Sequence, residues 1–383
     1  MTAMTRSVGI LLMGLLTSAS AFADFEIYGF AQLDYVQDFK RTDPKWISTF
    51  RPSTIPTQDG QFGSDGQAIL SPRQSRLGAQ GSWPTAGQNL KARIEFDFFG
   101  VGDNAGKVTP RLRHAYGEWG TVLAGQTWSN FMDIDGFPNI VDYWGPTGMV
   151  FIRTPQIRYT PVAGLNTVSV ALENPSADLD GSLGAVSADN KAPDLSAKYR
   201  YSPEWGHLSV SGIVRYLGFD TPGVAGADPK DNVFGWGLNI STSYVIGSTN
   251  KLILSAVTGQ GIANYMNDGG TDLAADGPPG DLQAKAVPLL GWVVYYDHHW
   301  SELWATSIGF SKTEVTNTDF QAANAYKFGE YSSVNMLYTP DKNILMGGEF
   351  LYGVREDKNG DRGEDYRLQF TFKYLFNNKW ALL

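Results

Sequence analysis

The sequence predicts an all-β protein, a transmembrane antiparallel β-barrel of about 16 strands, from three observations. Apolar or aromatic residues occupy every second position from Tyr366 to Phe376, which is typical of a strand with one lipid face and one wet face. Similar segments recur from Phe25 onward, separated by alternately short and long connections. Beyond the N-terminus, no run of about 18 apolar residues could span a bilayer as a helix. Lipid tolerates strands only in sheets without an edge, so the pattern predicts a closed barrel.

The N-terminus has the pattern of an export signal. Arg6 precedes an apolar run at 8–16, and Ala21 and Ala23 supply the small residues that a signal peptidase needs. We therefore expect residues 1–23 to be a signal peptide that directs Sec-type export and is cleaved before Asp24. Export without a later apolar helix fits a periplasmic, secreted or outer-membrane protein, and the strand pattern favours the outer membrane of a Gram-negative cell.

Composition excludes several other classes. The chain of 383 residues is 42% hydrophobic, with a mean hydropathy of −0.22, which is too polar for a helical membrane protein but suits alternating strands. It has no cysteine, so neither a disulfide framework nor a thiolate metal site is available, and we expect no cofactor. The formal net charge of −9 argues against a nucleic-acid partner.

Short and long connections alternate along the chain, and we expect the short ones in the periplasm and the long ones outside. The short connections are 84–89, 120–121, 161–164, 203–206, 247–250, 297–301 and 339–342. The long connections are 38–72, 100–109, 128–154, 174–192, 218–231, 261–284, 315–325 and 357–363. Three short ones follow Tyr, a small hydroxyl residue and Pro, at Tyr159, Tyr201 and Tyr338, which indicates a periplasmic aromatic girdle.

No linker divides the chain, so residues 24–376 are predicted to form a single barrel. The tail 377–383 follows the terminal aromatic Phe376 and is not explained by the barrel pattern. It could weaken recognition by the insertion machinery, or Trp380 and Leu382 could belong to an extended last strand.

Motifs for enzyme chemistry are scarce, and we predict no catalytic residue and no metal site. His298 and His299 lie in a predicted short turn, where a solvated pair is expected. His114 is expected on the opposite strand face from Arg111 and Arg113, at a subunit contact or the bilayer edge. An outer-membrane lipase would need this histidine beside a serine on the lipid face. The segment 357–361 resembles half of a calcium loop, but an external Asn-Gly turn is the stronger interpretation.

Basic residues recur on the predicted lumenal face of neighbouring strands. Strand parity also places Lys91 and Lys198 on this face. Glu95 and Asp97 share it and could neutralise part of the charge. Large barrels need polar lumens in any case, but arginine concentrated in consecutive strands is better explained by a transport path, because guanidinium groups replace the water that a carboxylate loses. The predicted pore-lining residues are Arg76, Arg93, Arg111, Arg113, Arg158 and Arg200.

The connection 128–154 is too long and too apolar to remain in solvent. Folding into the lumen would cover its apolar residues and narrow the pore. Asp133, Asp135 and Asp142 would then stand near the arginines and create a field across the pore. Alternatively, the loop packs over a neighbouring subunit and its acids are solvated.

Three segments of this sequence together resemble the DcaP-like porins of proteobacterial outer membranes. They run from Arg111 to Glu118, from Gly125 to Asp133, and from Pro138 to Pro146. The resemblance implies a trimeric, sixteen-stranded, anion-preferring channel for dicarboxylates and aromatic acids, with Arg111 and Arg113 in its basic lining and 128–154 as the constricting loop. Some relatives carry a coiled-coil stem before the barrel. Here the first strand is expected directly after the signal peptide, so trimerisation would rest on the barrel walls.

These observations together predict a passive outer-membrane porin for small hydrophilic solutes with a preference for organic anions. The expected partners are small anionic solutes, outer-membrane lipid and two further copies of the chain. A lipase-like barrel enzyme built on His114 and a non-conducting adhesin or structural barrel are the alternatives.

Overall fold

The structure is a computed structural model that describes residues 23–221, 230–278 and 282–382, with side chains from Asp24 to Lys379. The predicted signal peptide falls on residues 1–23, which, apart from the backbone of Ala23, lie outside the described residues. Within the described ranges there is no α-helix, only five short 3-10 turns. They are η1 (Pro52–Thr54), η2 (Gly102–Asn104), η3 (Ile134–Gly136), η4 (Gly181–Leu183) and η5 (Ala263–Tyr265). No helix in this part of the chain is long and apolar enough to cross a bilayer.

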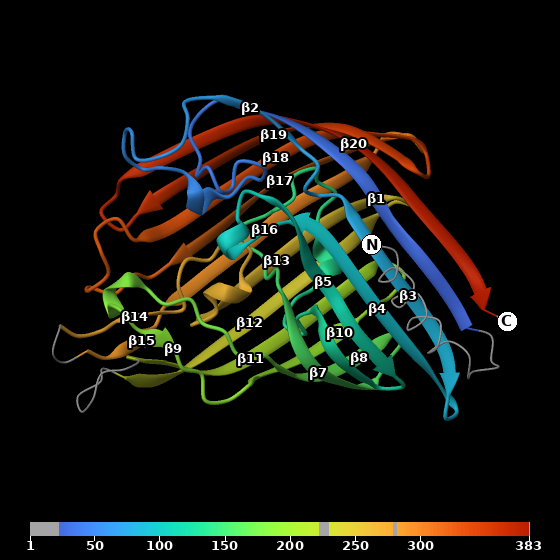
Figure 1. Ribbon diagram of the computed structural model, residues 1–383, viewed down its shortest axis with the longest axis horizontal. Helices are drawn as coiled ribbons and strands as arrows, with labels where there is room; N and C mark the ends of the chain where they lie inside the picture. Colours follow the sequence, from blue (N-terminus) through green and yellow to red (C-terminus); the bar gives the residue numbers. More distant parts are fainter. Residues whose placement is uncertain (1–22, 222–229, 279–281, 383) are drawn as a thin grey trace, which may run out of the picture.

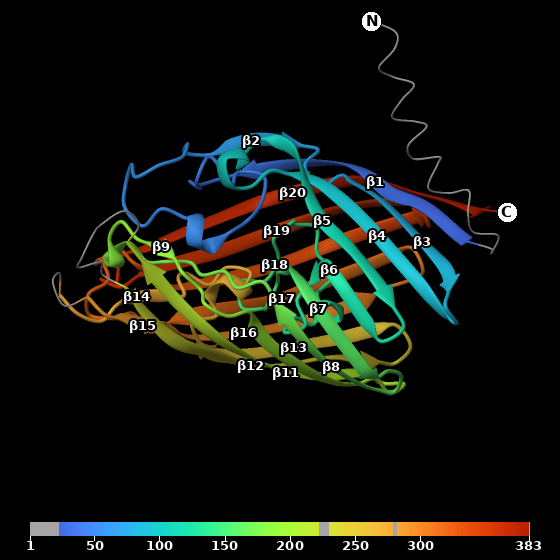
Figure 2. The ribbon, with the colours of Figure 1, turned by 60° about the horizontal axis from the view of Figure 1, so that its bottom comes forward.

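Sixteen antiparallel strands close into a single barrel, as the sequence predicts (Figures 1 and 2). Strands that neighbour each other along the chain pair in order, and β1 closes the ring by pairing with β20 from Ala23↔Leu382 to Asp38↔Arg367. The barrel strands are β1 (Ala23–Asp38), β3 (Arg76–Thr85), β4 (Gln88–Phe99), β5 (Val108–Trp119), β6 (Val122–Trp128), β7 (Arg153–Val162), β8 (Asn166–Glu173), β10 (Asp194–Tyr201), β11 (Gly206–Asp220), β12 (Asp231–Ile246), β13 (Asn250–Gln260), β16 (Pro288–His299), β17 (Trp304–Val315), β18 (Tyr326–Asp341), β19 (Ile344–Asp357) and β20 (Arg362–Leu382).

Four short strands belong to the long connections. β2 (Gln67–Ser71) pairs with the last residues of β1, from Asp34 to Asp38, and β9 (Ser187–Ala188) pairs with the end of β11. β14 (Leu273–Ala275) and β15 (Ala284–Ala286) form a separate hairpin in the connection between β13 and β16.

Alternation of burial along β20 shows the two faces of the wall. Phe370, Phe372 and Tyr374 are exposed on the outer, lipid-facing side, whereas Arg367 and Gln369 are buried in the lumen. This is the pattern that the sequence predicts for the closing strand, and it follows from side chains that alternate across the sheet.

The two ends of the barrel differ in the length of their connections. The first residue of β1 and the end of β20 lie at the end with short turns, which is the periplasmic end by the general rule for such barrels (Figure 1). Tyr159, Tyr201 and Tyr338 lie near this end, and Tyr338 stacks on Trp304 at 4.4 Å. Pairing shifts register after Tyr159 and after Tyr338, because the following prolines have no N–H to donate to the ladder.

The last strand does not end at the terminal aromatic. β20 continues past Phe376 to Leu382, and its last residues pair with the start of β1, including Asn377↔Tyr28 and Lys379↔Glu26. The tail 377–382 is therefore part of the wall.

The connection 129–152 between β6 and β7, called L3 here, folds into the lumen, as predicted. Phe131 and Met132 are buried against Ile213 of β11 and Val257 of β13. Further along, Met149 packs in a second cluster with side chains of β13, β16, β18 and β19, and with Phe50 of the first long connection. L3 thus crosses to the wall opposite β4 and β5. Its apolar residues find their cover inside the barrel of this chain.

Candidate functional site

Two carboxylates on β4 organise the arginines of the neighbouring strands. Arg113 of β5 binds both, with its Nε 2.7 Å from Glu95 Oε1 and its Nη1 2.9 Å from Asp97 Oδ2. Arg111 holds Asp97 with two nitrogens, at 2.6 and 3.0 Å. Arg93 lies 2.5 Å and Arg76 3.8 Å from Glu95. We call these four arginines and two acids the constriction cluster.

A β-bulge in β5 turns two successive side chains inward. Leu112 pairs with Phe96 and His114 pairs with Glu95, so Arg113 is the extra residue between them. The prediction that His114 lies on the opposite face from the arginines is therefore wrong. His114 is 2% exposed, and its Nδ1 is 3.0 Å from the Thr127 hydroxyl inside the barrel. The lipase alternative loses the lipid-facing histidine on which it depended.

The remaining predicted arginines lie on another part of the wall, and one of them, Arg200, binds L3. Arg158 donates to the Trp128 carbonyl at 2.5 Å. Arg200 binds Asp133 at 3.1 Å and Asp135 at 2.7 Å. His207 of β11 lies 2.6 Å from the second oxygen of Asp133. We call Arg200, His207 and the two aspartates the anchor cluster, because it fastens the start of L3 to β10 and β11.

The electrostatics of Asp133 follow from these contacts. Burial alone would raise the pKa of its carboxyl, but the hydrogen bond and charge of His207 and the hydroxyl of Ser241 outweigh burial and lower the pKa to about 2. Asp133 and Asp135 thus lie near one of the predicted pore arginines, Arg200, and both are paired directly with it.

The carboxylate of Asp142 is hydrogen-bonded to backbone N–H groups. It accepts from the Phe50 N–H at 3.0 Å and from the Trp144 and Gly145 N–H groups at 3.1 Å, and the side chain is 3% exposed. Burial raises the pKa of this carboxyl. Asp142 lines the same cavity as Arg113, but the acids that pair with Arg111 and Arg113 are Glu95 and Asp97, which strand parity had placed on the arginine face.

L3 reaches the constriction cluster through Tyr143, a residue that was not among the predicted site residues. Its hydroxyl donates to Asp97 Oδ2 at 2.8 Å, and its ring stacks on Phe99 at 4.1 Å. Arg113 also donates to this hydroxyl, at 3.2 Å. The contact holds the loop directly against the arginine-bearing strands.

A series of cavities runs along the lumen past this contact. An outer cavity of about 520 Å³, between L3 and the external loops, is lined by Arg111 and Arg153 among others. An inner cavity of about 340 Å³ is lined by Arg113, His114 and Lys373. Tyr143 and Phe151 line both cavities, so these two rings and the adjoining arginines form the partition between them.

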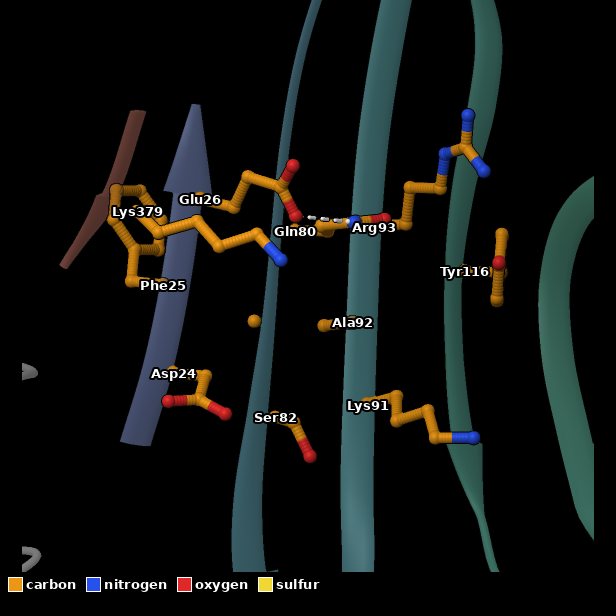
Figure 3. Close-up of a pocket in the computed structure, with 11 residues that line it drawn as sticks. Asp24, Phe25, Glu26, Gln80, Ser82, Lys91, Ala92, Arg93, Tyr116 and Lys379 are labelled. Atoms are coloured by element: carbon orange, nitrogen blue, oxygen red, sulfur yellow. Dashed lines mark hydrogen bonds between the residues drawn. The ribbon is translucent and has the colours of Figure 1, made fainter. Parts of the chain in front are cut away.

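The series continues to the periplasmic end. Arg76, Arg93 and Glu95 line both the inner cavity and a mouth cavity of about 770 Å³ that reaches Lys379 of the extended last strand. Figure 3 shows a further cavity of about 530 Å³ beside it, where Lys379 extends toward Gln80 and where Gln80 donates to Glu26 at 2.7 Å. Tail residue Lys379 therefore contributes charge to the periplasmic mouth.

Cations outnumber acids around the partition. Three of these cations, Arg51, Arg153 and Lys373, were not among the predicted site residues, and the last two have no ion pair within the described part of the chain. Their place on opposite sides of the partition depends on where L3 runs, and no sequence spacing reveals it. The cations that line the two cavities are Arg51, Arg76, Arg93, Arg111, Arg113, Arg153 and Lys373, against the carboxylates Glu95, Asp142, Asp178 and Asp268 of the linings and Asp97 beside them.

The external turn 357–361 has the predicted tight geometry. Gly360 adopts φ +90°, and its N–H donates to the Asp357 carbonyl at 2.9 Å. Asp357 forms an ion pair with Arg355 and accepts a hydrogen bond from the Thr57 hydroxyl, so both of its carboxylate oxygens already have protein partners.

A closed sixteen-stranded barrel with one loop folded into a charged lumen defines a porin-type protein of the Gram-negative outer membrane. The chain belongs to the DcaP outer membrane protein family, which it matches over residues 17–376. Among curated proteins, none matches the sequence.

Solved structures show the same fold at low identity. The outer membrane channel DcaP of Acinetobacter baumannii has a TM-score of 0.78 and 23% identity, covering 94% of this chain and 99% of that chain. An anion-selective porin from Comamonas acidovorans has a TM-score of 0.60 and 11% identity, covering 92% and 100%. The trimer form of OmpT from Vibrio cholerae has a TM-score of 0.56 and 12% identity, covering 92% and 99%. The family and the channels and porins among these neighbours speak for a channel rather than an enzyme.

Proposed function

We propose that this protein is a passive porin for small hydrophilic solutes that prefers organic anions, such as dicarboxylates and aromatic acids. One observation carries the proposal, namely the excess of cationic side chains over carboxylates at the partition between the outer and inner cavities. A solute that passes Tyr143 and Phe151 meets this positive charge at close range on both sides of the partition.

The chemistry of the cluster suits carboxylates. Guanidinium groups offer parallel N–H donors that match the two oxygens of a carboxylate. Glu95 and Asp97 hold Arg111 and Arg113 in fixed orientations without cancelling the total charge. Aromatic rings stand among the cations, with Arg111 5.3 Å from the Tyr143 ring and 5.8 Å from the Phe99 ring. Such surroundings favour flat anions, whose rings can stack while their carboxylates bind.

A homotrimer is part of the same proposal. The outer wall exposes large apolar side chains such as Leu77, Ile157 and Phe234, which suit either lipid or another barrel wall. The trimer form of the Vibrio cholerae protein, and the anion selectivity named for the Comamonas acidovorans porin, support the proposal by likeness of fold.

The test is a single-channel recording of the purified protein in a KCl gradient. We expect stepwise conductance and a reversal potential on the anion side, which weakens at high salt because ions screen the cluster. Arg111→Gln should move the reversal potential toward zero, and Arg111→Lys should keep it. A folded protein without current would favour a non-conducting barrel, and a cation-side reversal potential would refute the anion preference.

A further inference from the structure

Arg153, the first residue of β7, is a cation without a protein partner. Among the described residues its guanidinium has no hydrogen bond and no carboxylate within ion-pair distance, and its Nη1 is inaccessible to solvent. It lies 4.4 Å from the Trp128 ring centre and 6.0 Å from that of Phe151. A guanidinium held among rings without a counterion loses hydration that no protein group replaces. An anion in the outer cavity, which Arg153 lines, would replace it.

Lys373 of β20 is the corresponding cation on the other side of the partition. Its ammonium lies 4.6 Å from the Phe30 ring centre and has no hydrogen bond or ion pair with any residue that the structure describes. It lines the inner cavity, together with Arg76 and Arg113. Both free cations therefore face cavities, one before and one after Tyr143 and Phe151.

The other basic side chains of this region are already engaged. Arg111 and Arg113 are held by Asp97 and Glu95, so a solute carboxylate must compete with these acids. Arg73 has no carboxylate partner, but it is 2% exposed, donates to the Gly100 carbonyl and lines neither the outer nor the inner cavity. Arg51 of the outer cavity is held by Asp268 at 3.0 Å. Among the described residues that line the outer and inner cavities, Arg153 and Lys373 therefore remain as the two cations that a passing carboxylate can bind without displacing a protein acid.

We propose that Arg153 and Lys373 are two successive binding stations for solute carboxylates, one on each side of the partition. An organic anion entering from outside binds Arg153 first, with its apolar part against Trp128 or Phe151. It then passes the neutralised pairs of Arg111 and Arg113 and binds Lys373 before reaching the periplasmic mouth. The proposal rests on the proposed function and adds which residues hold the solute and in what order.

Two stations in series predict effects that depend on the side of addition. Sodium phthalate is the probe, added to one chamber while single-channel current interruptions are counted, in barrels inserted from one chamber so that one orientation predominates. Arg153→Gln should lower the frequency of interruptions about tenfold for external addition, which is the loss of one charge-assisted contact of about 1.4 kcal/mol. Lys373→Gln should do the same for periplasmic addition. Each variant should keep most of its response from the opposite chamber.

Matched controls separate binding from overall charge. Lys107→Gln and Lys251→Gln each remove one exposed cation, near the external and the periplasmic end respectively, and neither residue lines one of the four cavities described. Both should leave interruptions unchanged from either side. Arg153→Lys keeps the charge but loses the parallel N–H donors of the guanidinium group, so its frequency of interruptions should lie between those of the wild type and of Arg153→Gln. It also serves as the test variant if Arg153→Gln does not fold.

The possible results of these recordings lead to different conclusions. Side-specific losses in the two station variants, absent in the controls, support the stations. Unchanged interruptions, or equal losses from both sides, overturn them even if the wild-type channel is anion-selective. A wild-type channel without anion preference would instead refute the proposed function itself, so the two failures are distinguishable.

Discussion

Two parts of the barrel wall carry basic residues with the same strand parity but use them differently. On β3, β4 and β5, the constriction cluster lines the cavities on both sides of the partition. On β10 and β11, Arg200 and His207 bind Asp133 of L3, and neither lines the outer or the inner cavity. In one region, the acids come from the wall itself and leave cations in excess. In the other, the acids come from the loop and the basic groups become its attachment.

The difference teaches that an inward-facing arginine lines a pore only where L3 leaves it uncovered. L3 starts at β6, runs along β10, β11 and β12 through its anchor cluster, and reaches β4 and β5 through Tyr143. The four predictions below test this contrast, beginning with the largest expected effect.

Removing part of L3 should change permeation most. Deletion of residues 137–150 takes away Tyr143 and the apolar residues that fill the lumen, so conductance should rise several-fold and discrimination between solutes should fall. Single-channel recording measures both. Heat-modifiable migration on a semi-native gel checks that the deleted barrel is folded. Unchanged conductance in such a folded variant would mean that L3 does not limit the pore.

Arginine replacements in the two regions should have opposite signatures. Arg111→Gln should reduce anion preference, because it removes charge from the partition. Arg200→Gln should leave the reversal potential nearly unchanged but increase current flicker, because Asp133 and Asp135 lose a partner and L3 loosens. Equal shifts of reversal potential in both variants would contradict the division into a pore region and an attachment region.

Acid should weaken the attachment of L3 to β10 and β11. The folded-state pKa of Asp133 is lowered to about 2 from an ordinary value of 3.8, so its stabilising contribution is present above about pH 4 and is lost as pH falls toward about 2. The shift corresponds to about 2 kcal/mol at neutral pH. Asp133→Asn should lose this contribution at pH 7 and flatten the acid dependence, measured as the urea concentration that unfolds the barrel. An equally steep acid dependence in the variant would locate the effect elsewhere.

The smallest effect is expected at His114. Replacing it with Gln removes a ring that contacts Thr127 inside the inner cavity, while the charged members of the constriction cluster remain. Anion preference should therefore persist, with a change in conductance of less than about twofold. Loss of an ester-hydrolysing activity in this variant would instead revive the enzyme alternative.

Much of the fold could be predicted because β-barrels repeat a local rule. The alternation from Tyr366 to Phe376, the lengths of the connections and the apolar content of 128–154 yield the strand number and the inward loop. The rule fails at His114, because a bulge at Arg113 reverses the alternation of strand faces. Nothing in the local sequence indicates this bulge. The register shifts at Tyr159 and Tyr338 had a visible cause in the prolines that follow.

The candidate site divides in the same way. Parity alone put Arg76, Arg93, Arg111 and Arg113 in the lumen, and it also put Glu95 and Asp97 beside them. It could not distinguish Arg200, which L3 binds, from Arg111, which a cavity reaches. The reason is that both residues satisfy the same period of two, while their partners come from segments far away in sequence.

The sequence by itself determined that this chain is an outer-membrane barrel with a basic lumen and one apolar loop inside it, since strand periodicity and burial of apolar residues are properties of short segments. Only the tertiary structure decided which cations are neutralised and which are free. Arg153 and Lys373 carry the same charge as their neighbours, but charge becomes available to a solute only when no acid lies within reach. That depends on the path of L3 across the closed barrel, because ion pairs are set by distances of a few ångströms between strands that the chain order keeps far apart.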